Sequence, residues 1–110
     1  MPKYLFQATY SAEGIKGLEK DKAAGRKAAL TKAVEAVGGK LEAFYFAFGE
    51  HDWVLLADMP DNASATAFSF AVSGSGLLRA TTTPLASVEE VDRAFQKKAS
   101  FQAPGQFTSG

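Results

Sequence analysis

The sequence predicts an α+β fold in which four strands and three helices follow the order βαββαβα. Three observations carry this prediction. Short runs of aromatic and β-branched residues, which are typical of strands, alternate with stretches rich in alanine and lysine, which are typical of helices. Glycine and proline mark the ends of most of these segments. A serine followed three residues later by glutamate indicates the start of a last helix.

The first strand is predicted over residues 4–10, where YLFQATY is rich in aromatic residues. Ser11 follows it and is a good helix N-cap, although nearby glycines loosen the turn after it. Residues 21–37 carry apolar side chains at helical spacing, which predicts the first helix. Gly38 and Gly39 are expected to end that helix in a left-handed conformation.

The second and third strands are predicted over residues 40–48 and 52–59, joined by a hairpin whose tip has the sequence GEH. Gly49 is expected to take the positive φ that tight turns need. The second helix is predicted to begin after Asp61 or Asn62, which are both good N-caps, and to end in the glycines of SGSG.

The fourth strand is predicted over residues 77–83, where β-branched threonines recur. Ser87 and Glu90 form a capping box for a final helix, which has acidic residues in its first turn and lysines in its last. Residues 1–99 are therefore predicted to form a single domain. Residues 100–110 have no periodicity and are predicted to be a flexible tail or an arm laid on a neighbouring molecule. Without this terminal helix, the order βαββαβ is that of the ferredoxin-like fold, in which a four-stranded antiparallel sheet has helices on one face.

The composition excludes several classes of function. Twelve basic and twelve acidic residues leave no net charge to hold nucleic acid or an acidic membrane. The chain has no cysteine and one histidine, which excludes thiolate metal sites and a two-histidine metal site within one subunit. The N-terminus lacks a secretion signal, and no apolar run is long enough to span a membrane. We therefore expect a soluble cytoplasmic protein.

The charges are divided unevenly along the chain. Residues 1–40 hold eight Lys and Arg against four Asp and Glu, whereas residues 41–110 hold four against eight. Such patches either pair between subunits, steer a small anion, or are simply solvated faces.

The two middle strands are apolar on both faces. Alternation places Glu42 and Phe44 on one face of the second strand and Ala43 and Tyr45 on the other. In an antiparallel sheet with one solvent-exposed face, apolar and polar residues should instead alternate along each strand. We therefore expect both faces of this sheet to be buried. A second copy of the chain is the expected cover, in a homodimer or higher homo-oligomer of the dimeric α/β-barrel type.

Four stretches of the chain, GEHDWVLLADMPDNASA, GGKLEAFYFAFG, SAEGIKGL and RATTTPL with the glutamates after it, resemble the GYD family, named for a Gly-x-Tyr-Asp motif at this hairpin. The likeness spans about residues 3–103 and implies a ferredoxin-like subunit, a dimeric α/β barrel and no particular activity. Gly49 and Asp52 match the motif, but His51 stands where tyrosine is usual. If the tyrosine hydroxyl carries an activity, this chain lacks it; if the position needs only a flat ring, His51 serves.

His51 and Asp52 are the candidate catalytic residues. His51 is either a general acid or base near neutral pH, a ligand for a metal or haem, or an exposed turn histidine. Asp52 is either a base or a turn residue that accepts backbone N–H bonds. The sequence identifies no cofactor.

Polar and aromatic side chains on the predicted strands are candidates for a ligand site. They are Gln7, Thr9, Glu42, Tyr45, Trp53, Arg79 and Thr81. They either form a hydrogen-bonded network or line a cavity for a small apolar or weakly acidic molecule, with Arg79 as its charge partner. Three functions stay open: a homo-oligomer that binds such a molecule between sheet and helices or at the subunit interface, a cofactor-poor monooxygenase, isomerase or decarboxylase, and a structural assembly partner.

Overall fold

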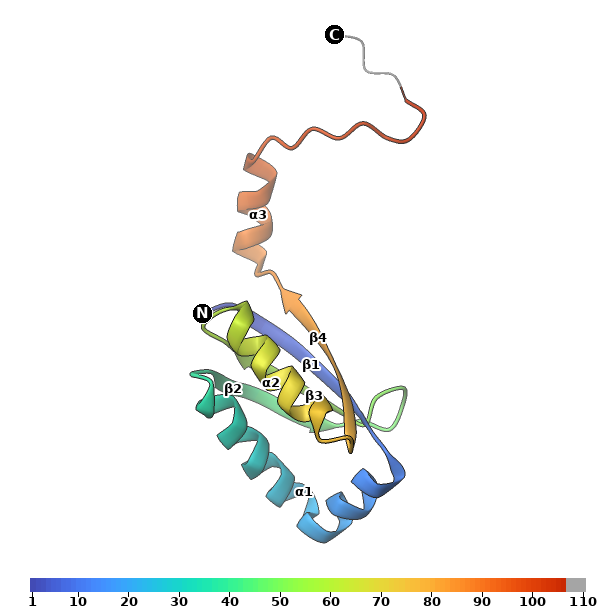
Figure 1. Cartoon of the computed structure of the whole chain (residues 1–110). Coiled ribbons are helices and arrows are strands. Elements are labelled where there is room, and N and C mark those ends of the chain that lie inside the picture. The colour runs from blue at the N-terminus through green and yellow to red at the C-terminus, as the bar shows by residue number, and fades with distance from the viewer. Residues whose placement is uncertain (107–110) are drawn as a thin grey trace.

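The predicted order of helices and strands is confirmed by the computed structural model, which describes residues 1–106. The elements are β1 (Lys3–Tyr10), α1 (Ala12–Ala36), β2 (Lys40–Phe46), β3 (Trp53–Asp58), α2 (Asn62–Gly74), β4 (Leu78–Leu85) and α3 (Val88–Gln96). The strands form one antiparallel sheet in the order β2-β3-β1-β4. Helices α1 and α2 lie against one face of this sheet (Figure 1), as expected for a ferredoxin-like fold.

Helix α1 begins nine residues before its predicted start, at Ala12 rather than residue 21. The Ser11 side chain caps it by accepting a hydrogen bond of 3.1 Å from the Gly14 N–H. The predicted start instead marks a kink, because Lys22 has a φ of 68° and interrupts the helix. Gly38 ends α1 with a φ of 82°, as predicted, because glycine has no Cβ to oppose that conformation.

The connection between β2 and β3 is longer than predicted. β2 ends at Phe46 and β3 begins at Trp53, and a hydrogen bond of 2.8 Å from the Ala47 N–H to the Asp52 carbonyl closes the loop. Among the described residues, the glycines with positive φ do not include Gly49, so that expectation is wrong. The longer loop reverses the chain without a left-handed residue at that point.

A β-bulge corrects the predicted side of Glu42. In the pairing of β2 with β3, Leu41 lies opposite Ala57 and Ala43 lies opposite Leu56, so Glu42 is the extra residue. Glu42 therefore does not share the helix-covered face with Phe44. Its carboxylate instead forms an ion pair with Lys3, which also pairs with Asp58.

The core lies between the sheet and helices α1 and α2. Its largest fully buried side chains are Trp53, Phe6, Phe68, Leu55, Met59 and Val34. The rings of Phe6 on β1 and Phe68 on α2 meet edge to face with centroids 4.8 Å apart, which ties helix to sheet.

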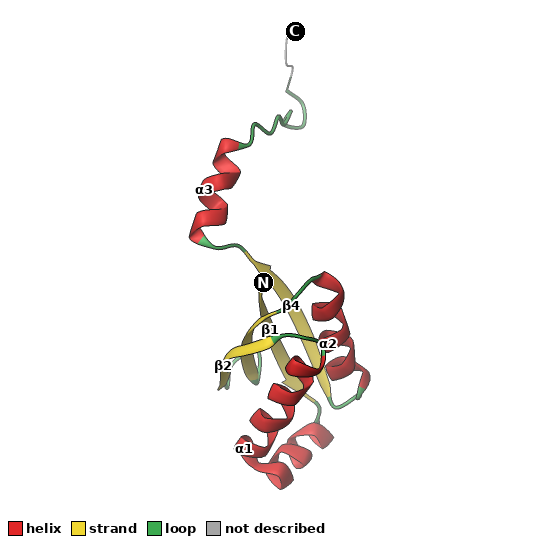
Figure 2. Cartoon of the chain, turned by 90° about the vertical axis from the view of Figure 1, so that its left-hand side faces the viewer, coloured by secondary structure: helices red, strands yellow, loops and turns green. Residues whose placement is uncertain are grey.

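The opposite face of the sheet is left open by the described elements (Figure 2). Leu5, Val54 and Leu56 on this face are only half-buried, and Tyr45 is 69% exposed. The prediction that β2 and β3 carry apolar side chains on both faces is thus confirmed for this patch. We call the whole face of the sheet opposite α1 and α2 the open sheet face. That a second copy of the chain covers it stays a prediction.

Helix α3 continues from the end of β4 and stands clear of the sheet and the other helices (Figures 1 and 2). Its predicted capping box is confirmed, since Ser87 and Glu90 exchange side-chain and backbone hydrogen bonds. Residues 97–106 form neither helix nor strand. Of the predicted tail, residues 107–110 lie outside the described residues. Within residues 1–106, none of the helices is long and apolar enough to cross a bilayer.

Candidate functional site

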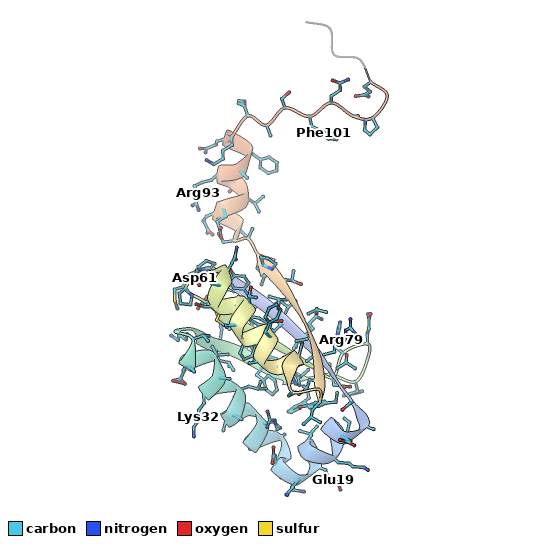
Figure 3. The ribbon with its side chains drawn as sticks, in the orientation of Figure 1. Glu19, Lys32, Asp61, Arg79, Arg93 and Phe101 are labelled. Atoms are coloured by element: carbon cyan, nitrogen blue, oxygen red, sulfur yellow. The ribbon has the colours of Figure 1, made fainter. Side chains whose placement is uncertain are left out.

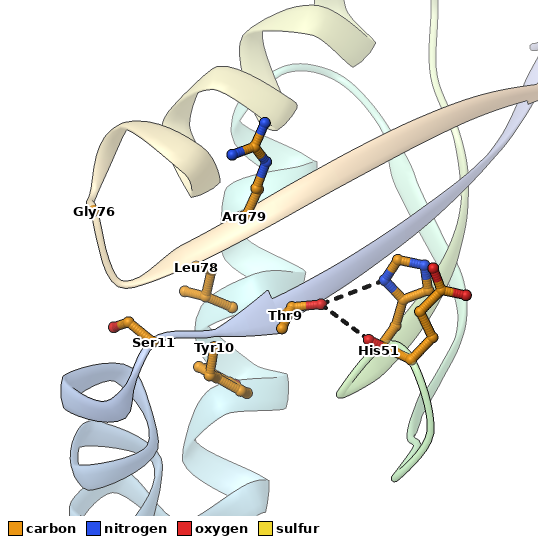
Figure 4. Close-up of a pocket in the computed structure, with 8 residues that line it drawn as sticks. Thr9, Tyr10, Ser11, His51, Gly76, Leu78 and Arg79 are labelled. Carbon is orange, nitrogen blue, oxygen red and sulfur yellow. Dashed lines mark hydrogen bonds between the residues drawn. The ribbon is translucent and has the colours of Figure 1, made fainter.

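A pocket of about 480 Å³ lies where β1 and β4 meet the loop between β2 and β3 (Figure 4). Its lining consists of Thr9, Tyr10, Ser11, Glu50, His51, Gly76, Leu78 and Arg79. The antiparallel pairing of β1 with β4 sets Thr9 directly opposite Arg79. Directly opposed residues share a face of the sheet, so both side chains belong to the open sheet face. We call this cavity the Arg79 pocket.

Asp52 fastens the β2–β3 loop to β1 beside this pocket. Its carboxylate Oδ2 accepts a hydrogen bond of 2.7 Å from the Tyr10 N–H, and its own N–H donates one of 2.7 Å to the Ala8 carbonyl. The first of these is the contact expected of a structural turn residue. Because both bonds run to the end of β1, they hold the adjoining residue His51 next to Thr9.

The imidazole of His51 faces the hydroxyl of Thr9, with Nδ1 3.4 Å from Oγ1 (Figure 4). The Thr9 hydroxyl also lies 3.3 Å from the Glu50 carbonyl oxygen, to which it donates. Since a hydroxyl has one hydrogen, this donation leaves the oxygen of Thr9 to accept from Nδ1–H. Nε2 is then the ring nitrogen free to take a proton from, or give one to, a molecule in the pocket.

Arg79 is an exposed cation that has no acidic partner among residues 1–106. The ion pairs of the described residues join Lys3 to Glu42 and Asp58, and Arg26 to Asp21. Arg79 takes part in none of them, although Glu50 lines the same pocket. A guanidinium presents paired N–H donors that match a carboxylate, so Arg79 is the group in this pocket best suited to bind an acid.

The structure brings together some of the predicted ligand residues and separates others. Thr9, Arg79 and His51 line one pocket. Gln7 and Thr81 pair one step further along the same two strands, and the Thr81 hydroxyl lies 3.4 Å from the Gln7 carbonyl. Their side chains share the open sheet face with Thr9 and Arg79.

The remaining ligand candidates lie elsewhere. Tyr45 and Glu42 are on β2, at the opposite edge of the sheet from β4. Glu42 belongs to a polar network, and its hydrogen bond, with that of Asp58, raises the pKa of the Lys3 ammonium group. Trp53 is fully buried on the helix-covered face and does not line the Arg79 pocket.

A second, smaller cavity of about 230 Å³ lies between the sheet and the kink in α1, and its lining includes Tyr10, Arg26 and Leu78. Within the described residues, the Tyr10 hydroxyl and the Trp53 indole N–H are buried without a hydrogen-bond partner. Burial raises the pKa of the Tyr10 hydroxyl, and the nearby positive charge of Arg26 opposes this. Tyr10 thus lines both this cavity and the Arg79 pocket.

Sequence reasoning considered Tyr10 as a possible pocket hydroxyl but did not include Ser11, Glu50, Gly76 and Leu78 in the site. Glu50 was adjacent to a candidate and could have been included on that ground. The others become neighbours because the Ser11 N–H donates a hydrogen bond of 2.8 Å to the Leu77 carbonyl, which joins the start of α1 to the start of β4. No local pattern in the sequence signals that contact.

The family model of the GYD domain matches residues 4–95, from β1 into α3. This chain belongs to the GYD-domain family. The resemblance stated from the sequence is therefore confirmed. No curated protein and no solved structure matches the chain. In this GYD domain the aspartate of the motif, Asp52, holds the β2–β3 loop on β1, and His51 at the tyrosine position faces the Arg79 pocket.

Proposed function

We propose that this GYD-domain protein is a homo-oligomer that binds a small, weakly acidic molecule with an apolar part in the Arg79 pocket. The observation that carries the proposal is the guanidinium of Arg79, which has no ion-pair partner in the described part of the chain and lies directly opposite Thr9 in a pocket of about 480 Å³. A carboxylate beside Arg79 would gain charge-assisted, paired hydrogen bonds. Apolar surface for the rest of the ligand is offered by the half-buried side chains of Leu5, Val54 and Leu56, which lie further along the open sheet face.

Charge in the pocket favours a monoanion. Arg79 is the basic side chain and Glu50 the acidic one in the lining, and His51 lies beside them. A ligand with one carboxylate neutralises Arg79, whereas a second carboxylate would meet Glu50. We therefore expect monocarboxylates to bind better than dicarboxylates of similar size.

Self-association would close the site. The Arg79 pocket lies at one end of the open sheet face, whose apolar part, with Leu5, Val54 and Tyr45, is left accessible by the chain itself. Apolar patches that stay accessible on a monomer favour association. A second copy packed on this face would also cover the pocket and remove its ligand from water.

Thermal-shift titration with benzoate, with neutral benzamide of matched shape, tests the binding proposal. We expect benzoate to raise the melting temperature of the wild-type protein and of Arg93→Gln, in which a remote arginine is changed, but not of Arg79→Gln. Benzamide should give no shift. If hexanoate and benzoate both fail to stabilise the protein, or if the shift survives in Arg79→Gln, the proposal is wrong. Sedimentation velocity at micromolar concentration tests the oligomer separately.

A cofactor-poor enzyme, such as an isomerase, decarboxylase or monooxygenase, is the second candidate function. It is supported by His51, which lies in the Arg79 pocket with Nδ1 beside Thr9 and Nε2 free. His51 would move the proton while Arg79 holds the substrate carboxylate; Asp52, whose carboxylate already accepts the Tyr10 N–H, would position the loop. For any keto acid that is turned over, His51→Gln should abolish turnover and leave the melting temperature within about 2 °C of wild type. Unchanged turnover in that variant would remove His51 from the mechanism.

A further inference from the structure

Helix α3 carries an apolar stripe that the rest of the described chain, residues 1–106, leaves largely exposed. Val88, Val91 and Phe95 recur at helical spacing, and they are 76%, 42% and 79% exposed. A helix as short as Val88–Gln96 is marginal in water without packing. Its capping box stabilises one end only. We therefore expect the apolar face of α3 to pack on another surface.

The helix cannot readily reach the body of its own chain. Only Ala86 and Ser87 separate β4 from α3, and the helix runs onward from the end of that strand (Figure 3). β4 is one edge strand of the sheet and β2 is the other. Any apolar groove beside β2 is therefore on the far side of the sheet from the start of α3.

Such a groove exists between α1 and β2, with a volume of about 290 Å³. Its lining consists of Ala23, Ala24, Lys27, Phe44, Tyr45 and Phe46. The two alanines allow close approach of another helix, and the aromatic rings provide apolar surface for Val91 and Phe95. We call it the α1–β2 groove.

Charges on the two surfaces are complementary. Helix α3 carries Glu89, Glu90 and Asp92 against Arg93, and α1 carries an excess of lysine and arginine over acidic residues. Lys27 lines the groove itself. Asp92 lies next to the apolar stripe on the helix surface, so it is placed to meet a cation at the rim.

We propose that the Val88, Val91 and Phe95 face of α3 docks in the α1–β2 groove of a second copy of this chain, and that the two copies exchange these arms reciprocally. The inference rests on the homo-oligomer part of the proposed function. If two open sheet faces pack about a two-fold axis along the strands, β4 of one copy lies over β2 of the other. The end of β4 at Leu85 is aligned across the sheet with the start of β2 at Lys40, so the helix that leaves β4 starts over the Lys40 end of β2 in the other copy. It reaches Phe44 and Phe46 in the groove by turning back along that strand at Ala86 and Ser87.

Cross-linking of two cysteine variants tests the exchange, because the chain has no cysteine of its own. Full-length Val91→Cys and Ala24→Cys, one of them carrying a mass tag, are mixed, oxidised and run on a non-reducing gel. We expect a disulfide-linked heterodimer of tagged and untagged chains. Arg93→Cys, on the opposite side of α3, is the matched control and should give at least tenfold less of it. Cross-linking only between two Val91→Cys chains would place α3 against another α3 and overturn the proposal.

Sedimentation separates this inference from the proposed oligomer. Val91→Asp combined with Phe95→Asp should raise the dissociation constant of the oligomer at least tenfold, whereas Arg93→Asp should leave it unchanged. Far-ultraviolet circular dichroism reports whether each variant is folded, because Trp53 packs on Phe44 of the groove and its fluorescence would itself respond to docking. If the double variant and wild type form the same oligomer and no cross-link forms, the arm exchange is wrong while the oligomer stands. If the wild type sediments as an 11.7 kDa monomer, both are wrong.

Discussion

The carboxylate of Asp52 accepts the backbone N–H of Tyr10 at 2.7 Å, and this contact holds the β2–β3 loop on the end of β1. Asp52 is part-buried, so its replacement leaves an amide with no protein partner. The contact also sets the position of His51 opposite Thr9. One hydrogen bond thus couples the stability of the domain to the geometry of the Arg79 pocket.

Asp52→Ala should lower the free energy of unfolding by about 1–3 kcal/mol, because it removes a charge-assisted hydrogen bond to a part-buried amide. Urea denaturation followed by Trp53 fluorescence measures the change. Glu50→Ala, in the same loop, is the control, since no contact of its carboxylate is lost. A loss of less than about 0.5 kcal/mol in Asp52→Ala would show that the loop stays on β1 without this bond.

Glu50→Gln should strengthen benzoate binding about two- to fivefold, because it removes the negative charge that shares the pocket with Arg79. Calorimetric titration at low ionic strength measures the affinity. Raising the salt to 0.5 M should reduce the difference between the two proteins, since the effect is electrostatic. Equal affinities for wild type and variant at low salt would mean that Glu50 points away from the bound ligand.

Gly39→Ala should destabilise the domain by about 1–3 kcal/mol because there is no room for a methyl group. A Cβ at this position would lie 2.7 Å from Met59 Sδ and 2.8 Å from the Asp58 carbonyl oxygen. Gly17→Ala is the matched control: a Cβ there meets nothing within 4 Å, and alanine favours the helix by about 0.5–1 kcal/mol. Urea denaturation of both variants should move the midpoint in opposite directions; a shift in the same direction would contradict the packing argument.

The N-cap carboxylate of α2 should make stability depend on acid pH. Hydrogen bonds from Ser64 hold the pKa of Asp61 below its ordinary value. A depressed pKa means that the stabilisation is complete above the unfolded-state pKa and is lost as pH falls through the lower folded-state pKa. Thermal melts between pH 7 and pH 2.5 should therefore show a smaller acid loss for Asp61→Asn than for wild type. Thr66→Ala, which leaves the cap intact, should keep the wild-type profile, and an identical profile for Asp61→Asn would exclude Asp61 as a source.

Part of the site could have been anticipated from the sequence. Arg79 and Thr9 were singled out because they are polar residues in predicted strands whose other residues are mostly apolar. That their strands are adjacent follows from the ferredoxin-like fold, in which β1 and β4 are neighbours. Their direct opposition depends on register, which follows from the pairing of whole strands. Trp53 was grouped with them on residue type alone. Its burial under the helices shows that residue type by itself does not predict which side chains line the pocket.

The features that could be read from the sequence are those decided within a few residues. Ser11, Asp61 and the Ser87–Glu90 box each satisfy N–H groups in their own first helical turn, and Gly38 ends α1 through its own backbone freedom. The order of elements and the fold follow from such signals together with strand periodicity. Physical interactions of this range are contained in a short stretch of sequence.

The features decided only by tertiary structure depend on contacts between distant segments. The bulge at Glu42 and the binding of Asp52 to Tyr10 each arise because one strand must match another across the sheet. The kink at Lys22 occurs within a helix whose periodicity predicted only its second half. The Arg79 pocket is built from residues between 9 and 79 and forms only once the strands are paired, because pairing determines which side chains meet. Strand pairing also fixes where β4 ends, and so leaves α3 projecting beyond the sheet with its apolar face uncovered.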